Sequence, residues 1–185
     1  MRAAVLAATI TELTESGYAA LTVEGVAQRA GVHKTTIYRH WKDSDGLVAH
    51  ALASHFAMDI PIPDTGAVES DLSALARSLV ATMTTQTGRA LLTTVLSDAV
   101  RLPRFAEVKH ALFDDRFRRA EPVVTRAVER GELPADTDPA ELLKALAAPI
   151  YFRLVFTCEP VDEATADRAV HVALAAAHAG ALPAV

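Results

Sequence analysis

The chain has 185 residues, of which 51% are hydrophobic and only 5% aromatic, and its formal net charge is −5. Much of the hydrophobic content is alanine, leucine and valine, a mixture that favours helices over sheets. No apolar run approaches the roughly 18–20 residues needed to cross a bilayer. The single cysteine, Cys158, excludes an intrachain disulfide and a cysteine-built zinc cluster. We therefore expect an all-α protein of the cytoplasm.

The N-terminal part of the chain predicts a small helical domain over residues 1–57. Apolar residues at three- and four-residue steps predict a first helix that ends at Gly17. Thr22 is a suitable N-cap for the second helix, and Gly31 breaks the chain before the third. The helices of this domain are expected over about 3–16, 22–29, 33–40 and 45–57.

A proline- and glycine-containing loop over residues 60–66 marks the boundary to a second, larger helical domain over 67–185. Asp138-Pro139 is a strong start signal for one of its helices, and Glu141 is placed for a reciprocal capping bond. Pro122 should kink or split the long helix that contains it. Helices of this domain are expected over about 72–83, 91–100, 102–130, 139–156 and 162–179.

The two short helices around Gly31 have the pattern of a helix-turn-helix, in which the second helix enters the major groove of DNA. Ala27 is small where two helices must nearly touch, and Gly31 permits a positive φ in the turn. Ile37 and Trp41 lie one helical turn apart and are expected to face inward. The opposite, outward face then carries residues suited to phosphates and base edges, Lys34, Thr35, Tyr38 and Arg39.

The negative net charge argues against nucleic acid until it is resolved locally. Residues 1–56 hold five Lys/Arg and five Asp/Glu, so the entire surplus of −5 lies in the rest of the chain. Between Gly25 and Lys42 there is no acidic residue. The segment is therefore a small cationic patch, with counterion release expected at Arg29, Lys34, Arg39 and Lys42.

The first 50 residues closely resemble the amino-terminal signature of TetR-family transcriptional regulators. The motifs that carry this resemblance are Gly17-Tyr18, Leu21-Thr22-Val23, Val26-Ala27, Ala30-Gly31-Val32 and Thr36-Ile37-Tyr38-Arg39-His40-Trp41, followed by Leu47. The resemblance implies an all-helical homodimer, usually a repressor, that leaves its operator when a small molecule fills the C-terminal domain. By position, it implies base and nearby backbone contacts for Lys34, Thr35 and Tyr38, and phosphate contacts for Thr22, Thr36 and His40. With their neighbours, the candidate DNA-binding residues are Thr22, His33, Lys34, Thr35, Thr36, Tyr38, Arg39, His40 and Lys42.

Three positions depart from the family pattern. His33 stands where a serine often caps the recognition helix, so it either caps poorly or itself touches DNA. Ser44 replaces a lysine that often precedes the fourth helix, and Glu24 lies near the DNA edge, where a carboxylate repels phosphate. Together they predict a modest affinity for DNA in general.

The last helix, over 162–179, is apolar on nearly all sides in its second half, so a second copy of the chain is expected to cover part of it. The TetR resemblance agrees, because dimers of that family pair their last two long helices. A homodimer carries two helix-turn-helix heads, residues 1–57 of each copy. This implies a palindromic operator on double-stranded DNA.

Aromatic residues concentrate on two helices of the larger domain, which suggests a pocket for a small, uncharged, hydrophobic effector. Core packing explains the same spacing, and the alternative stays open. The candidate pocket residues are Met58, Leu96, Phe105, His110, Phe113, Phe117, Tyr151 and Phe152.

Two other classes of function compete with DNA binding. An enzyme is disfavoured because the chain contains no glycine-rich phosphate loop and no nucleophile elbow, and we expect neither a cofactor nor a metal. His40 and His50 lie on different predicted helices without a third ligand. A helical scaffold for protein partners remains the main alternative, although it gives no role to the cationic short helix.

Overall fold

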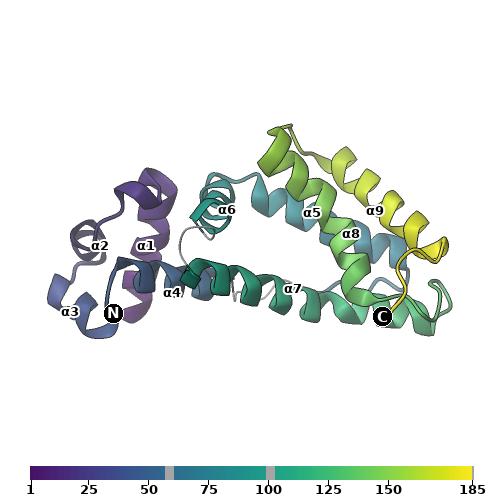
Figure 1. Ribbon diagram of the computed structural model, residues 1–185, viewed down its shortest axis with the longest axis horizontal. Helices are drawn as coiled ribbons and strands as arrows, with labels where there is room; N and C mark the ends of the chain where they lie inside the picture. Colours follow the sequence, from purple (N-terminus) through teal and green to yellow (C-terminus); the bar gives the residue numbers. More distant parts are fainter. Residues whose placement is uncertain (57–60, 99–102, 185) are drawn as a thin grey trace. The chain divides into compact units, whose positions relative to one another are not determined.

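The structure, a computed structural model, describes residues 1–56, 61–98 and 103–184, and within these ranges it contains helices and no β-strand. The expectation of an all-α fold is confirmed. The chain forms two compact units, residues 1–59 with 85–113 and residues 60–84 with 114–185. The long helix α7 contributes to both units, because its first part packs in one and the rest in the other (Figure 1).

The first unit contains the predicted helix-turn-helix. Its helices are α1 (Arg2–Ser16), α2 (Val23–Ala30), α3 (Lys34–His40), α4 (Ser44–Phe56), α6 (Gln86–Asp98) and the start of α7 (Pro103–Glu129), with a 3-10 turn at Tyr18–Ala20. Helix α1 is central, because it contacts α2, α4 and α6. The packing units therefore do not follow the chain as two consecutive ranges.

Two apolar clusters hold the first unit together. One joins α1 to the helix-turn-helix through Val5, Val26, Ile37, Trp41 and Leu47. The other joins α1 and α4 to α6 and α7 through Leu13, Val48, Leu52, Leu91, Val95 and Phe105. The orientation of α2 and α3 is thus fixed by α1 and α4, and that of α1 and α4 by the helices that come later in the chain.

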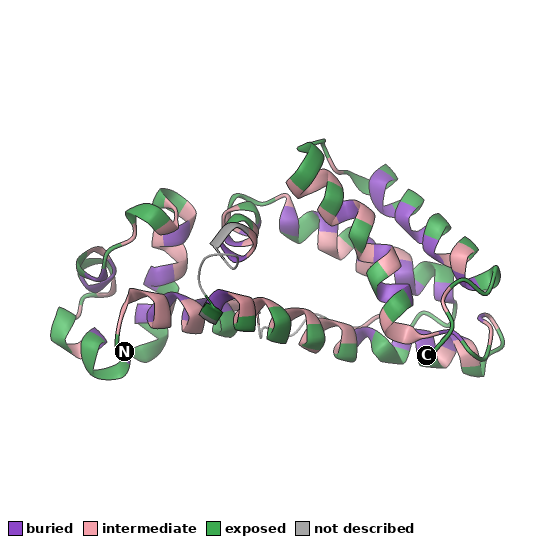
Figure 2. Cartoon of the chain, in the orientation of Figure 1, coloured by how far each residue is buried: buried purple, intermediate pink, exposed green. Residues whose placement is uncertain are grey.

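The second unit is built on α5 (Val68–Met83), α8 (Pro139–Phe152), α9 (Glu163–His178) and the remainder of α7. Helix α9 packs against both α5 and α8. Its buried residues, including Ala166, Ala169 and Ala173, lie along one face (Figure 2). Alanine at these positions lets the helix axes approach closely.

The helix ends of the second unit follow local chemistry. Asp138 accepts a hydrogen bond from the backbone N–H of Glu141, as expected, but the Glu141 carboxylate pairs with Lys144 at 2.6 Å. A full capping box forms at α9 between Asp162 and Thr165. Pro122 does not split α7, and the expected helix over 139–156 changes after Phe152 into a π-helical segment, Arg153–Thr157.

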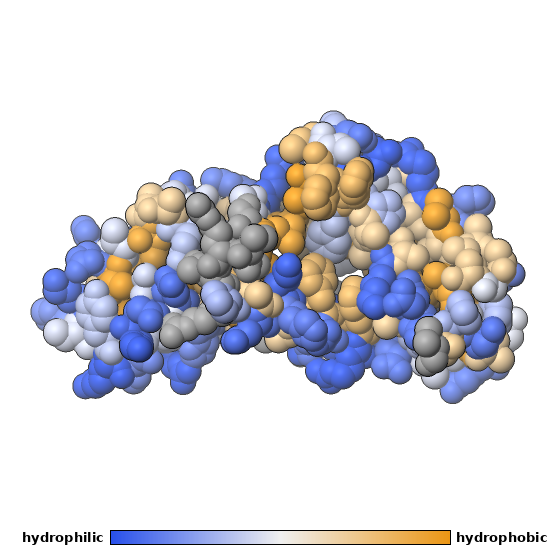
Figure 3. All heavy atoms as spheres, viewed as in Figure 1, coloured by the Kyte–Doolittle hydropathy of each residue, from blue (hydrophilic) through white to orange (hydrophobic). Residues whose placement is uncertain are grey.

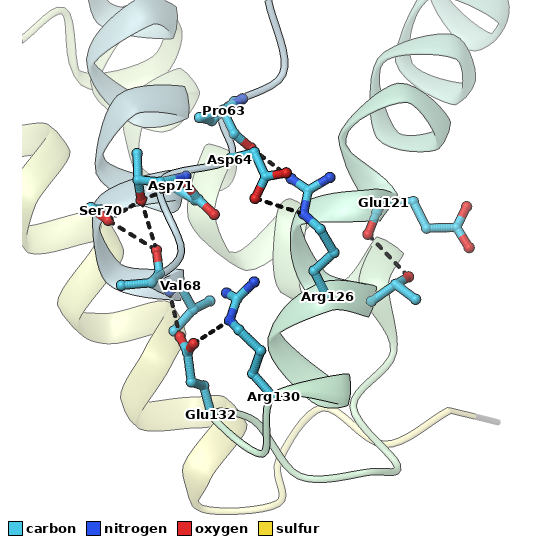
Figure 4. A network of polar contacts seen from close by, with 12 residues as sticks. Pro63, Asp64, Val68, Ser70, Asp71, Glu121, Arg126, Arg130 and Glu132 are labelled. Atoms are coloured by element: carbon cyan, nitrogen blue, oxygen red, sulfur yellow. Dashed lines mark hydrogen bonds and ion pairs between the residues drawn. The ribbon is translucent and has the colours of Figure 1, made fainter.

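The segment that leads into α5 is bound to the end of α7 by polar contacts (Figure 4). Arg126 donates to the carbonyl oxygen of Pro63 at 2.6 Å, and its Nε lies 3.3 Å from Asp64. Glu132 accepts from the backbone N–H of Val68 at 2.5 Å. Asp71, which is fully buried, accepts from the backbone N–H and the hydroxyl of Thr65, each at 2.7 Å. These contacts anchor the chain where it enters the second unit.

Candidate nucleic-acid interface

The turn between α2 and α3 has the geometry that the sequence predicts. Thr22 caps α2 by accepting from the backbone N–H of Gly25 at 3.0 Å. Gly31 ends α2 in the left-handed region, with φ 66°, and the N–H of Val32 returns to the carbonyl of Ala27 at 3.0 Å. A residue with a Cβ is strained at this φ, so glycine suits the position.

Helix α3 has one buried and one exposed face. Ile37 and Trp41 are 1% and 6% exposed and pack into the first apolar cluster, as predicted. Tyr38 is 49% exposed although it is a large aromatic residue. A tyrosine that protrudes from a surface offers both a ring and a hydroxyl to a partner. The other exposed residues of this face are His33, Lys34, Thr35, Arg39 and His40, while Thr36 is half-buried and Lys42 is exposed just beyond the helix.

Trp41 also connects α3 to α4. Its Nε1 donates a hydrogen bond of 3.0 Å to Nδ1 of His50, whose Nε2 lies 3.2 Å from the Arg2 guanidinium. Burial and, to a smaller extent, the charge of Arg2 lower the pKa of His50, so the neutral ring that can accept from Trp41 is favoured. The His40 ring lies against Trp41, with centroids 5.6 Å apart.

Of the four Lys/Arg residues of the cationic patch, Arg29 and Lys34 are held in ion pairs. Arg29 is bound by Glu12 at 2.8 Å and Glu15 at 2.5 Å, both on α1, and these bonds raise its pKa. It is therefore a structural link between α1 and α2, and the expectation of counterion release at Arg29 does not fit this pairing. Among the described residues, Arg39 and Lys42 make no ion pair.

Lys34, the first residue of α3, pairs with Glu24 of α2 across the turn, with Nζ and Oε1 3.2 Å apart. Both side chains are 60% exposed. The pKa of Glu24 is lowered by a hydrogen bond with its own backbone N–H and by Lys34. The sequence placed Glu24 near the DNA edge but did not indicate this partner, because the two residues lie on different helices.

His33 makes no side-chain capping bond to α3, which agrees with its poor expected capping. Asp43 caps α4 by accepting from the backbone N–H of Gly46 at 2.8 Å. The visible surface over α2 and α3 is mainly hydrophilic (Figure 3). The exposed face of α3 thus combines cations, hydroxyls and one tyrosine, which are the groups that bind phosphates and base edges.

The candidate effector residues fall into both units. In the first unit, Phe105 is fully buried in the second apolar cluster, Leu96 and Phe113 are half-buried, and His110 is exposed. Met58 lies outside the described residues.

In the second unit, Phe117 lines a cavity of about 380 Å³ with Asp114, Arg118, Glu121, Asp138 and Lys144. Tyr151 is half-buried, and burial raises its pKa. Phe152 is 55% exposed and stacks on Phe156, with centroids 5.4 Å apart. The described residues contain no group of three side chains arranged for a metal ion.

Two family descriptions match this chain. Residues 5–51 match "Bacterial regulatory proteins, tetR family", and residues 62–173 match "Tetracyclin repressor-like, C-terminal domain". The chain belongs to the TetR family. It is a helix-turn-helix transcription regulator, as the resemblance of its first 50 residues implied.

Relatives of this TetR-family regulator match over nearly its whole length. The HTH-type transcriptional regulator AqdR of Rhodococcus erythropolis is 30% identical over 94% of this chain and 83% of its own. The DNA-binding transcriptional repressor TetR of Mycobacteroides abscessus is 31% identical over 91% and 88%. The crystal structure of the TetR family transcription regulator SCO0332 superposes with a TM-score of 0.73 and 34% identity, covering 94% and 96% of the two chains. No helix in the described part of this TetR-family chain is long and apolar enough to span a membrane.

Proposed function

We propose that this TetR-family chain is a cytoplasmic, homodimeric repressor that binds a palindromic operator and leaves it when a small, uncharged, hydrophobic molecule occupies the C-terminal domain, residues 67–185. The observation that carries the proposal is the exposed face of α3. It presents Lys34, Thr35, Tyr38 and Arg39 outward while Ile37 and Trp41 fix the helix from behind. The DNA contacts are assigned to Thr22, His33, Lys34, Thr35, Thr36, Tyr38, Arg39, His40 and Lys42.

The palindrome follows from the dimer. Two heads related by a two-fold axis read the same sequence on opposite strands, with half-sites separated by whole helical turns of DNA. The proposed dimer surface is on α8 and α9. Val172 is 59% exposed on α9, and Ala175 and Ala179 on the same side are also exposed. An apolar face of this kind is stabilised when a second copy covers it.

The effector is the second part of the proposal. Phe117 and Tyr151 are the aromatic candidates that are half-buried in the second unit, and Phe117 lines the cavity of about 380 Å³. Native mass spectrometry of the protein purified from its own host tests this part. A retained small molecule, lost on mild denaturation, is the expected result.

The DNA-binding part is tested by footprinting on a palindrome that the wild-type protein selects from random duplexes. Lys34→Ala and Tyr38→Ala are expected to abolish the footprint while sedimentation still shows a dimer. Lys144→Ala removes a lysine that is paired with Glu141 in the second unit and serves as the control. A footprint unchanged by both head substitutions contradicts the proposal. If the protein binds no duplex even at low salt, the alternative function, a helical scaffold for protein partners, is favoured.

A further inference from the structure

The ion pair between Glu24 and Lys34 places a carboxylate at the edge of the exposed face of α3. Lys34 is the first residue of that helix, and its Nζ lies 3.2 Å from the Glu24 carboxylate. Both side chains are 60% exposed, so the pair is open to solvent and to any partner of α3. Exposed pairs of this kind contribute little to stability. The pair matters more for a charged partner, because while it is intact the Glu24 carboxylate offsets the Lys34 charge that a phosphate would otherwise meet.

We propose that Glu24 is a specificity-determining residue. It holds Lys34 in place for a base edge and lowers the affinity of the helix-turn-helix for non-operator DNA. The inference rests on the proposed DNA-binding role of α3. It adds a function for a carboxylate that, by its charge alone, opposes DNA binding.

The geometry of the lysine head group allows both effects. An ammonium has three donors, and the Glu24 carboxylate uses one of them. At an operator, Lys34 can keep this bond and donate another to a guanine acceptor in the major groove. On non-operator DNA the acceptor pattern at that place differs, so a contact that Lys34 can make while paired with Glu24 is not matched. There Lys34 could reach a phosphate only by leaving Glu24, and the ionised carboxylate would then repel the same backbone. On such DNA Lys34 therefore stays paired with Glu24 and neutralises no phosphate.

The small number of other cations makes this effect measurable. Arg29 is held by Glu12 and Glu15, so Arg39 and Lys42 are the cations of the described α2–α3 segment that have no ion pair. Sequence-independent binding depends on the number of phosphates that cations neutralise. One lysine more or less in each head therefore changes that number by a large fraction.

The test compares Glu24→Gln with the wild-type protein on two labelled duplexes, one of random sequence and one carrying the palindrome selected by the wild type. Binding is followed by fluorescence anisotropy over a range of salt concentrations. Two freed lysines per dimer should steepen the plot of log K against log salt for random DNA by about 1.8. Affinity for random DNA at fixed salt should rise by about 2- to 25-fold. Affinity for the palindrome should rise less, so that the ratio of the two affinities falls.

Glu141→Gln is the matched control. Glu141 also lies in the first turn of a helix and is also paired with an exposed lysine, Lys144, but it belongs to the second unit. The Glu141→Gln substitution removes the same charge as Glu24→Gln but changes no residue of α2 or α3. If Glu141→Gln has the same effect as Glu24→Gln, net charge alone is responsible and the proposal is wrong.

Two further variants separate the two proposed effects of Glu24, the positioning of Lys34 and the weaker binding to non-operator DNA. In a Lys34→Gln background, Glu24→Gln should no longer steepen the salt dependence. Glu24→Asp keeps the charge but is shorter by one methylene, so it should weaken binding to the palindrome while leaving binding to random DNA unchanged. Equal gains on both duplexes, or no change in slope for Glu24→Gln, overturn the proposal. If the wild type selects no palindrome, or Lys34→Ala binds it as well as the wild type, the proposed DNA-binding role itself has failed.

Discussion

Nε1 of Trp41 donates a hydrogen bond of 3.0 Å to Nδ1 of His50, and this bond ties the end of the recognition helix α3 to the middle of α4. Trp41 is 6% exposed and follows the last residue of α3. Its partner must be a neutral imidazole, since a protonated ring has no free lone pair at Nδ1. The position of α3 is therefore connected to a proton equilibrium.

The first prediction is that acid destabilises the first unit through His50. Burial lowers the pKa of His50 in the folded chain, so the unfolded chain binds the proton more readily. The contribution is fully present above the unfolded pKa of about 6.5 and is lost as the pH falls through the lowered, folded value. Urea denaturation between pH 7.5 and 5 should show this loss. His50→Gln should flatten the dependence of the free energy of unfolding on pH. His171→Gln, which replaces an exposed histidine of α9, should leave that dependence unchanged.

The second prediction separates the cations of the head. Lys42→Gln should reduce the slope of log K against log salt on random DNA by about 1.8 per dimer. Arg29→Gln should leave that slope unchanged and slightly lower the stability of the first unit, because Arg29 binds Glu12 and Glu15. If Arg29→Gln reduced the salt dependence as much as Lys42→Gln does, Arg29 would have to leave the carboxylates of Glu12 and Glu15 to bind a phosphate.

The third prediction concerns two phenylalanines from the candidate effector set. Phe105→Ala should lower the free energy of unfolding by about 3–5 kcal/mol, because the ring is fully buried beside Leu13 and Leu52. Phe152→Ala removes a ring that is 55% exposed and should change it by less than about 0.5 kcal/mol. Chemical denaturation monitored by circular dichroism measures both. Equal losses would mean that Phe152 is covered in the folded protein.

The fourth prediction tests the dimer surface. Val172→Asp places a charge on the exposed apolar side of α9 and should weaken dimerisation about tenfold or more. Sedimentation velocity over a range of concentrations reports the change. Thr125→Asp adds the same charge at an exposed position of α7 and should leave the dimer intact. A dimer that tolerates the Val172→Asp substitution uses a different face.

The local features of the helix-turn-helix were predictable because they depend on neighbours in the chain. The cap at Thr22, the left-handed turn at Gly31 and the inward position of Ile37 follow from capping and a 3.6-residue period. The contacts between helices did not follow, because they depend on crossing angles. The bond from Arg29 to Glu12 and the pair between Lys34 and Glu24 are of this kind.

The effector residues illustrate a second limit. Phe105 and Phe152 both occur at helical spacing, yet one is fully buried and the other is more than half exposed. Periodicity assigns a residue to a face of its helix but does not say what covers that face. Glu141 shows a different limit: it was expected to complete a capping box but pairs with Lys144 three residues on, because two local partners compete for one carboxylate.

The packing of α6 against α1 bears on how such regulators can be recombined. A chimaera that transplants only residues 1–57 onto another body would leave Leu13, Val48 and Leu52 without the partners that Leu91, Val95 and Phe105 supply. The donor head would then have to repack on foreign side chains. Exchange of DNA specificity between relatives is therefore easier by changing the exposed positions of α3 than by swapping the segment as a cassette.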